Sequence, residues 1–252
     1  MRRLTTYDQY VKKLTVLEER IENKKQFPFS LPAIRSLDEL IFHPNVTYIM
    51  GENGMGKSTL LEAIAVNYGF NPEGGTKNFN FASYESHSNL DRYIRLSKGV
   101  KRPKDGFFFR AETFYNVATN IEELDEGDGG PKIIDRFGGK SLHEQSHGES
   151  FFAAFMNRFS GNGLYILDEP EAALSPMRQL SLLARIHELI ENGSQFIIST
   201  HSPLLMAYPE STLYQLNEVG ISTVTLEETE HYQIMEQFFN DKQRLFYHLF
   251  QR

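Results

Sequence analysis

Residues 51–59 constrain this chain more than any other segment. They read GENGMGKST and fit the pattern G-x-x-x-x-G-K-[ST]. Residues 46–50 are apolar or β-branched, which predicts a buried strand, and residues 60–66 have the composition of a helix. A glycine-rich turn at such a junction wraps closely around phosphate oxygens, because its N–H groups point at the anion and no Cβ intervenes. A random chain of this length contains the pattern only about once in a hundred cases, so we predict a phosphate-binding loop.

Two side chains in this loop supply most of its chemistry. Lys57 provides a positive charge for the β- and γ-phosphates of a nucleotide, and the Ser58 hydroxyl is a ligand for Mg²⁺. Lys57 is therefore also a candidate catalytic residue. The full predicted contact set is Gly51, Glu52, Asn53, Gly54, Met55, Gly56, Lys57, Ser58 and Thr59.

The composition fits one domain, or one domain with a lobe. The 252 residues are enough for a full core, and the net charge of −7 argues against a wholly basic nucleic-acid binder without excluding a local basic patch. There is no cysteine, so disulfide and thiol chemistry are excluded. No apolar run reaches the roughly 18 residues of a membrane helix, and the start lacks the apolar core of a signal peptide. We expect a soluble, cytoplasmic protein that does not insert into membranes.

Residues 7–25 are predicted to form a helix ahead of the main domain. An apolar face recurs there at helical spacing, with charges elsewhere, and consists of Tyr10, Leu14, Leu17 and Ile21. Such a face packs either on its own domain or on a partner, and the sequence leaves both readings open.

A basic cluster interrupts this acidic chain. Its members are Arg92, Arg95, Lys98, Lys101, Arg102 and Lys104. They form either a solvated hairpin or a contact for a nucleic-acid backbone. Only Tyr93 lies among them, which is too few aromatic side chains for a base-stacking platform. Residues 106–110, which follow, are predicted to form a buried strand.

Residues 145–150 read QSHGES and precede an apolar helix. A polar helix start that contains glycine suits an anion, since its free N–H groups and its dipole point outward. Ser146, Gly148 and Glu149 are candidate phosphate contacts on this ground. A plain helix cap is the alternative that the segment alone leaves open.

A hydrophobic strand over residues 164–167 ends in two acids, Asp168 and Glu169. Carboxylates in this position lie at the carboxyl edge of a sheet, where ligands of open α/β sheets bind. One of them can hold Mg²⁺ through its water shell, and the next can orient or deprotonate an attacking water. A second buried strand, residues 195–199, brings His201 to the same edge and indicates a γ-phosphate contact.

The helix between these strands has clear boundaries. Ser175 is the predicted N-cap, Pro176 the first helical residue and Gly193 the stop. Its predicted buried stripe is Leu180, Leu183, Ile186 and Ile190. From Glu230 onward the chain is predicted to be helical and to pack on the domain.

These elements, in this order, resemble the ATPase domains of the ABC superfamily from about residue 28 to residue 226. The resemblance implies an α/β fold of the P-loop NTPase type: a mostly parallel sheet flanked by helices, with an antiparallel β lobe and a helical signature region. It implies an ATPase domain at residues 28–252, ending in a helical segment at about 228–252. Residues 1–27 would be an N-terminal helix and its connection.

The resemblance also assigns roles. Residues 51–59 correspond to Walker A, and residues 166–169 close Walker B. ATP is the implied substrate and Mg²⁺ the implied metal, supported by Asp168. Glu169 corresponds to the catalytic base, and His201 to the switch histidine.

A signature segment implies a second copy. Residues 146–150 resemble the segment that caps the γ-phosphate bound by the other subunit, and residues 171–175 take the D-loop position. This implies a head-to-tail homodimer with two buried ATP molecules, in which each subunit binds one ATP and covers the ATP bound by the other.

The sequence departs from transporter ATPases at two places. They carry a glutamine between Walker A and the signature, but none occurs here from residue 59 through residue 144, and Glu112 is the candidate substitute in the metal shell. The signature has His147 and Glu149 where transporters favour Gly and Gln. Both features resemble the soluble branch, which includes chromosome-maintenance and recombination-repair ATPases.

Three functions follow from these observations. The favoured expectation is a soluble ATP hydrolase whose nucleotide-gated dimer acts on a protein partner or on nucleic acid. The alternatives are the ATP-binding subunit of a membrane transporter and a nucleotide switch with negligible turnover. Intact Lys57, Ser58, Asp168 and Glu169 favour hydrolysis over the switch.

Overall fold

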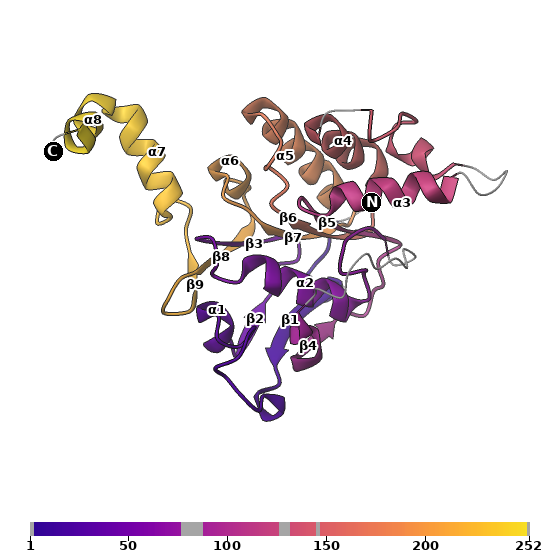
Figure 1. The fold of residues 1–252 in the computed structure, drawn as a ribbon, viewed down its shortest axis with the longest axis horizontal. Coiled ribbons are helices and arrows are strands. Elements are labelled where there is room, and N and C mark those ends of the chain that lie inside the picture. Colours follow the sequence, from indigo (N-terminus) through magenta and orange to yellow (C-terminus); the bar gives the residue numbers. More distant parts are fainter. Residues whose placement is uncertain (1–2, 77–87, 126–131, 145–146, 251–252) are drawn as a thin grey trace.

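The fold is organised around a six-stranded sheet whose central strands are apolar and buried (Figure 1). The structure is a computed structural model and describes residues 3–76, 88–125, 132–144 and 147–250. The strands of this sheet are β3 (Val46–Gly51), β5 (Asp105–Arg110), β6 (Gly163–Asp168), β7 (Gln195–Ser199), β8 (Ser211–Leu216) and β9 (Ile221–Val224). Their order is β5-β6-β7-β3-β8-β9, and all neighbours are parallel except the edge pair β8 and β9. This confirms the expected α/β class.

Helices cover both faces of the sheet. They are α1 (Pro32–Arg35), α2 (Lys57–Tyr68), α3 (Phe114–Asp125), α4 (His147–Ala153), α5 (Pro176–Glu191) and α6 (Pro203–Met206). Helix α2 lies on one face, and α3 to α6 lie on the other (Figure 1). Along β5, Phe107 and Phe109 join the core under α3 to α5, whereas Phe108 joins the core under α2. Because strand side chains alternate, this double burial needs the continuous apolar runs that the sequence shows.

A second sheet, with three antiparallel strands, packs against α2. It has the order β2-β1-β4 and consists of β1 (Val11–Val16), β2 (Glu39–Ile41) and β4 (Ile94–Lys98). Its apolar side chains share one core with α2. This sheet is the antiparallel lobe that the resemblance implied.

The predicted helix at residues 7–25 is wrong, because that segment contains β1. The pairing of β1 with β4 shifts register between Val11 and Lys13, so that Val11 and Leu14, three residues apart, are both fully buried. A β-bulge adds one residue to a strand, and the resulting spacing imitates one turn of a helix. The apolar face packs on its own domain, which is one of the two alternatives stated above.

The boundaries of α5 are confirmed. Ser175 is the N-cap, its Oγ accepts a hydrogen bond from the Arg178 N–H, and Pro176 is the first helical residue. The stripe is partly wrong, since Leu180 is exposed. The buried residues of α5 are Leu182, Ile186, Leu189 and Ile190.

Replacing Ser175 with Ala is expected to lower the free energy of unfolding by about 1 kcal/mol, because the α5 N-terminus loses its side-chain acceptor. Urea unfolding measures this change. Ser181→Ala is the matched control, because Ser181 lies inside the same helix, is exposed and only donates back to the Met177 carbonyl. Equal losses in the two variants would contradict the capping role.

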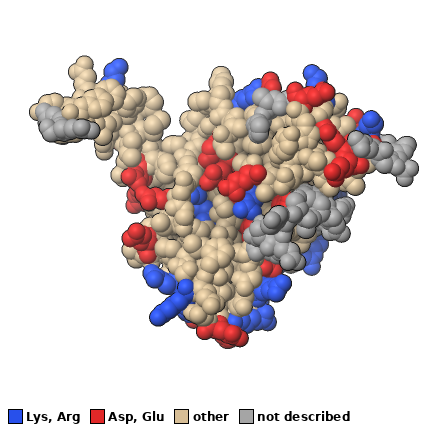
Figure 2. Space-filling view, in the orientation of Figure 1, with Lys and Arg blue, Asp and Glu red and all other residues tan. Residues whose placement is uncertain are grey.

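The basic cluster is exposed on the antiparallel lobe but is not a hairpin. Arg95 and Lys98 lie on β4, which pairs with β1, whereas β5 belongs to the large sheet. Lys101 pairs with Asp8, and Lys98 lies over the ring of Tyr68. Figure 2 shows Lys and Arg on the visible face of this lobe together with acidic residues. The nucleic-acid reading of the cluster stays a prediction.

The C-terminal segment is helical but does not pack on the domain as predicted. Helices α7 (Glu230–Asn240) and α8 (Lys242–Phe250) contain no fully buried residue and project from the body beyond the β9 edge (Figure 1). None of the described helices has the length and apolar character needed to cross a membrane.

Candidate active site

The carboxyl ends of three neighbouring parallel strands meet at one edge of the large sheet. β7 lies between β6 and β3, and Ser199 at its end is in register with Asp168 on one side and Ile49 on the other. The loop after β3, the acids after β6 and the histidine after β7 therefore lie together. Figure 2 shows acidic and basic side chains gathered over this part of the molecule.

The loop after β3 has the geometry of an anion cradle. Gly54 and Gly56 have φ angles of 81° and 100°, which L side chains rarely adopt, and Gly56 leads directly into α2. The Lys57 side chain is 5% exposed, and its Nζ donates to the carbonyls of Gly51 at 2.8 Å and Glu52 at 3.1 Å. The ammonium therefore folds back over the loop. Burial lowers the pKa of Lys57, while neighbouring carboxylates act in the opposite direction.

The oxygen atoms expected to hold Mg²⁺ lie together. The Ser58 Oγ is 3.2 Å from Oδ1 of Asp168, which is buried and also accepts a hydrogen bond from the Ser199 hydroxyl. Burial raises the pKa of Asp168, and these two hydroxyl donors oppose the rise. A hydroxyl and a carboxylate at this spacing suit Mg²⁺, which proteins usually bind through one or two such ligands plus substrate phosphates.

Glu169 and His201 face each other beside this pair. Glu169 has a left-handed backbone, with φ of 50°, and its N–H is held by the carbonyl and hydroxyl of Ser199. The Glu169 Oε1 lies 3.5 Å from the His201 Nε2, which has no hydrogen-bond partner among the described residues. Burial, followed by the nearby Lys57 charge, lowers the pKa of His201. Burial thus favours the neutral imidazole, and its Nε2 is available for a further contact.

Glu171 holds the backbone of His201 in this arrangement. Its Oε1 accepts the His201 backbone N–H at 2.6 Å, and burial raises its pKa above the usual 4.5. The folded state thus favours the protonated Glu171 carboxyl. As pH rises from 4.5 to the pKa that Glu171 has in the folded state, this group increasingly lowers the free energy of unfolding.

Glu171→Gln is therefore expected to stabilise the protein at pH 8 and to have a smaller effect at pH 5. The amide keeps an acceptor for the His201 N–H but cannot ionise. Urea unfolding at the two pH values measures the difference, with the exposed Glu188→Gln as control. A loss of stability that is the same at both pH values would contradict the assignment.

The signature segment is only partly described. Ser146 lies outside the described residues, and helix α4 begins at His147. Gly148 is buried, and a Cβ built on it would lie 2.3 Å from the Ala173 carbonyl, so the tip of α4 packs tightly on the turn that follows Glu169. Glu149 is exposed and lies 4.0 Å from Arg178.

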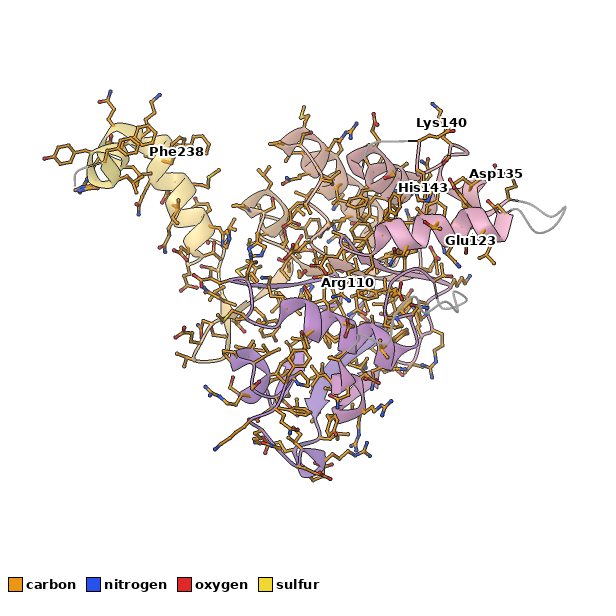
Figure 3. All side chains as sticks on the ribbon, viewed as in Figure 1. Arg110, Glu123, Asp135, Lys140, His143 and Phe238 are labelled. Carbon is orange, nitrogen blue, oxygen red and sulfur yellow. The ribbon has the colours of Figure 1, made fainter. Side chains whose placement is uncertain are left out.

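Two residues beside the candidate metal site were missed by sequence reasoning. Arg110, labelled in Figure 3, ends β5 and donates to Glu62 at 2.7 Å, while its Nε is 3.9 Å from Asp168. Ser199 is the hydroxyl donor to Asp168 described above. The available signal was position alone, because both residues end strands next to β6.

The structure places Glu112 next to Arg110 rather than next to Asp168. The Glu112 side chain is 80% exposed, and its carboxylate lies 3.6 Å from Arg110. Arg110 stands between Glu112 and Asp168, so the metal role of Glu112 stays a prediction.

A pocket of about 490 Å³ adjoins the cradle on the side of β8. Its lining comes from the loop, from the β8–β9 turn and from the first residues of α7. His231, at the start of α7, also lies close to His201, with 5.5 Å between ring centroids. The cleft is thus bounded by segments far apart in the sequence.

Comparisons with known proteins found a matching family model and several similar sequences. A family model described as "AAA domain, putative AbiEii toxin, Type IV TA system" matches residues 87–207. The chain is 27% identical over 206 residues to the energy-coupling factor transporter ATP-binding protein EcfA2 of Methanospirillum hungatei, a match that covers 77% of this chain and 51% of that protein. It is 26% identical over 221 residues to the energy-coupling factor transporter ATP-binding protein EcfA of Methanococcus maripaludis, with 81% and 77% covered.

The similarity has limits in length and in shape. The chain spans about half the length of the first of these relatives. A solved structure described as an ATP-binding subunit of an ABC transporter is 18% identical, covers 84% of this chain and 91% of its own, and has a TM-score of 0.45. The sequence matches show similarity to ABC-type ATP-binding proteins and, at residues 87–207, to an AAA-domain family. The named relatives come from transporters, so they do not confirm the predicted soluble branch.

Proposed function

We propose that this chain binds and hydrolyses ATP, and that it works as a nucleotide-gated head-to-tail dimer acting on a protein partner or on nucleic acid. The observation that carries the proposal is the meeting of Lys57, Ser58, Asp168, Glu169 and His201 at one sheet edge. Each matches, by type and position, a role in phosphoryl transfer to water.

Each of these side chains has its own role in the proposed reaction. Lys57 and the loop N–H groups hold the β- and γ-phosphates, while Ser58 and Asp168 would hold Mg²⁺, which would neutralise negative charge that develops on the phosphates. Glu169 orients the attacking water and accepts its proton. His201 contacts the γ-phosphate and is held in place by Glu171, which accepts a hydrogen bond from the His201 backbone N–H. The pocket beside the loop has room for the nucleoside.

The second copy supplies the other wall of the site. In this proposal the N-terminus of α4, which carries the exposed Glu149 and is anchored by the buried Gly148, covers the γ-phosphate bound by the partner copy. ATP then closes the dimer, and hydrolysis reopens it. A symmetric pair suits such a device, because the two surfaces are complementary in each copy.

A transporter subunit is the second candidate. It is favoured by the two relatives, which are named as transporter ATP-binding proteins. The matching family model is described as an AAA domain, and the signature residues His147 and Glu149 differ from those that transporters favour. Both observations favour the soluble ATPase over the transporter subunit. Co-purification with a membrane protein would support the transporter reading.

Steady-state release of phosphate from ATP, with and without duplex DNA at two salt concentrations, tests the proposal. Turnover that requires Mg²⁺ is expected, and absence of turnover under all conditions would leave only a nucleotide switch. If the basic cluster contacts DNA, any stimulation should fall steeply with salt, since each phosphate contact releases counterions. Salt-insensitive stimulation would contradict that contact.

A further inference from the structure

Helices α7 and α8 form an arm that exposes more apolar surface than a helical pair in water normally does. The exposed apolar side chains of this C-terminal arm are Ile234, Met235, Phe239, Phe246, Tyr247, Leu249 and Phe250. Phe239 and Phe250 are each 74% exposed. A contiguous exposed apolar surface of this kind marks an interaction site.

A ring contact joins the two helices, and another lies within α8. Phe238, labelled in Figure 3, packs edge-on against Phe246, with 5.9 Å between ring centroids, and Phe246 stacks on Phe250. These contacts fix the bend of the arm but bury no side chain fully. The outer apolar faces of both helices therefore need a cover.

We propose that the C-terminal arm docks on the arm of a second copy of this chain. The argument is charge complementarity. The α7 helix carries Glu236 on its projecting part and Glu230 at its base, beside the pocket, whereas α8 carries Lys242 and Arg244. Among the described residues, no ion pair is formed by any of these four side chains. In a two-fold pairing, the acidic α7 of each copy lies along the basic α8 of the other.

The lengths of the helices suit the same arrangement. α7 has 11 residues and α8 has 9, so at about 1.5 Å per residue the two helices have similar lengths. Two such arms, paired in this way, place their apolar faces between them and their charges at the rim.

A membrane surface fits the arm less well. Helices that lie on membranes are rich in Lys and Arg on their polar face. The arm has three acidic residues, Glu230, Glu236 and Asp241, against the two basic ones, and is therefore not drawn to anionic lipid.

This contact is separate from the nucleotide-gated one. The arm leaves the body beyond β9, and α4 packs on the other side of the molecule (Figure 1). Pairing through the arm therefore needs no nucleotide and leaves the α4 tip free. Its failure and the failure of the proposed function are consequently distinguishable.

Sedimentation velocity of the whole chain without nucleotide tests the inference. The unmodified protein is expected to dimerise, and the double variant Phe239→Glu/Phe250→Glu to dimerise at least about a hundredfold more weakly. Val100→Glu is the control, since Val100 is 70% exposed and lies outside the arm. Lys57→Ala should dimerise like the unmodified protein. A protein that stays monomeric over a wide dilution series would overturn the proposal.

A charge exchange makes the test independent of the aromatic residues. Glu236→Lys and Lys242→Glu, each alone, oppose like charges and should weaken self-association, whereas an equimolar mixture should form heterodimers, because each new charge meets its opposite. No recovery in the mixture would count against the pairing. So would a monomer that floats with anionic vesicles and loses this property in the Phe239→Glu/Phe250→Glu variant, since the arm would then be a lipid-binding surface.

Discussion

Replacing Glu169 with Gln is expected to lower steady-state ATP hydrolysis by about two to four orders of magnitude, the usual contribution of a positioned general base. The amide keeps the size of the side chain and its contact distance to His201, but it cannot accept the proton of the attacking water. ATP binding should be retained, and the ATP-bound dimer should accumulate. Phosphate release and gel filtration in the presence of ATP and Mg²⁺ measure the two effects.

The control for this variant is Glu188→Gln, an exposed α5 carboxylate paired with Arg185 that is remote from the sheet edge. It should hydrolyse ATP at the unmodified rate. Glu169→Gln with normal turnover would show that another group accepts the proton. Reduced turnover without dimer accumulation would keep the base but reject the nucleotide-gated dimer.

Lys57→Ala is expected to weaken ATP binding by at least about a hundredfold, because a desolvated ammonium that contacts phosphate oxygens forms charge-assisted hydrogen bonds. Isothermal titration with ATP and Mg²⁺ measures the change. Lys57 also caps the carbonyls of Gly51 and Glu52, so the variant's melting temperature has to be measured in parallel. The exposed Lys104→Ala is the control, and equal affinity in the two variants would contradict the phosphate role.

Local signals allowed the centre of this fold to be predicted. The loop at residues 51–59, the acids after β6 and His201 each follow a continuous apolar strand, and such runs identify buried parallel strands without knowledge of their neighbours. The boundaries of α5 could be predicted in the same way, because Ser175, Pro176 and Gly193 each act on only the nearest one or two turns of the chain. Parallel strands then bring their ends to one edge by topology alone.

Long-range pairing decided the parts that could not be predicted. The bulge in β1 exists only because β1 pairs with β4, about eighty residues later, so its spacing looked helical in isolation. Arg110 and Ser199 reach Asp168 because β5 and β7 flank β6, an order that no local pattern records. The free arm was missed for a related reason, since an amphipathic helix has the same sequence whether its cover comes from the same chain or from another.

The close packing of Gly148 on the Ala173 carbonyl couples two working parts. Helix α4 and the turn beyond Glu169 cannot slide past each other, because the contact leaves no room even for a methyl group. In the proposed dimer, a shift of the carboxylate during turnover is thus transmitted to the helix tip that would cover the neighbouring copy's nucleotide. If the copies associate as proposed, ATP hydrolysis at the two sites is expected to be coupled. The packing of α4 on this turn links each site to the terminal phosphate bound by the other copy.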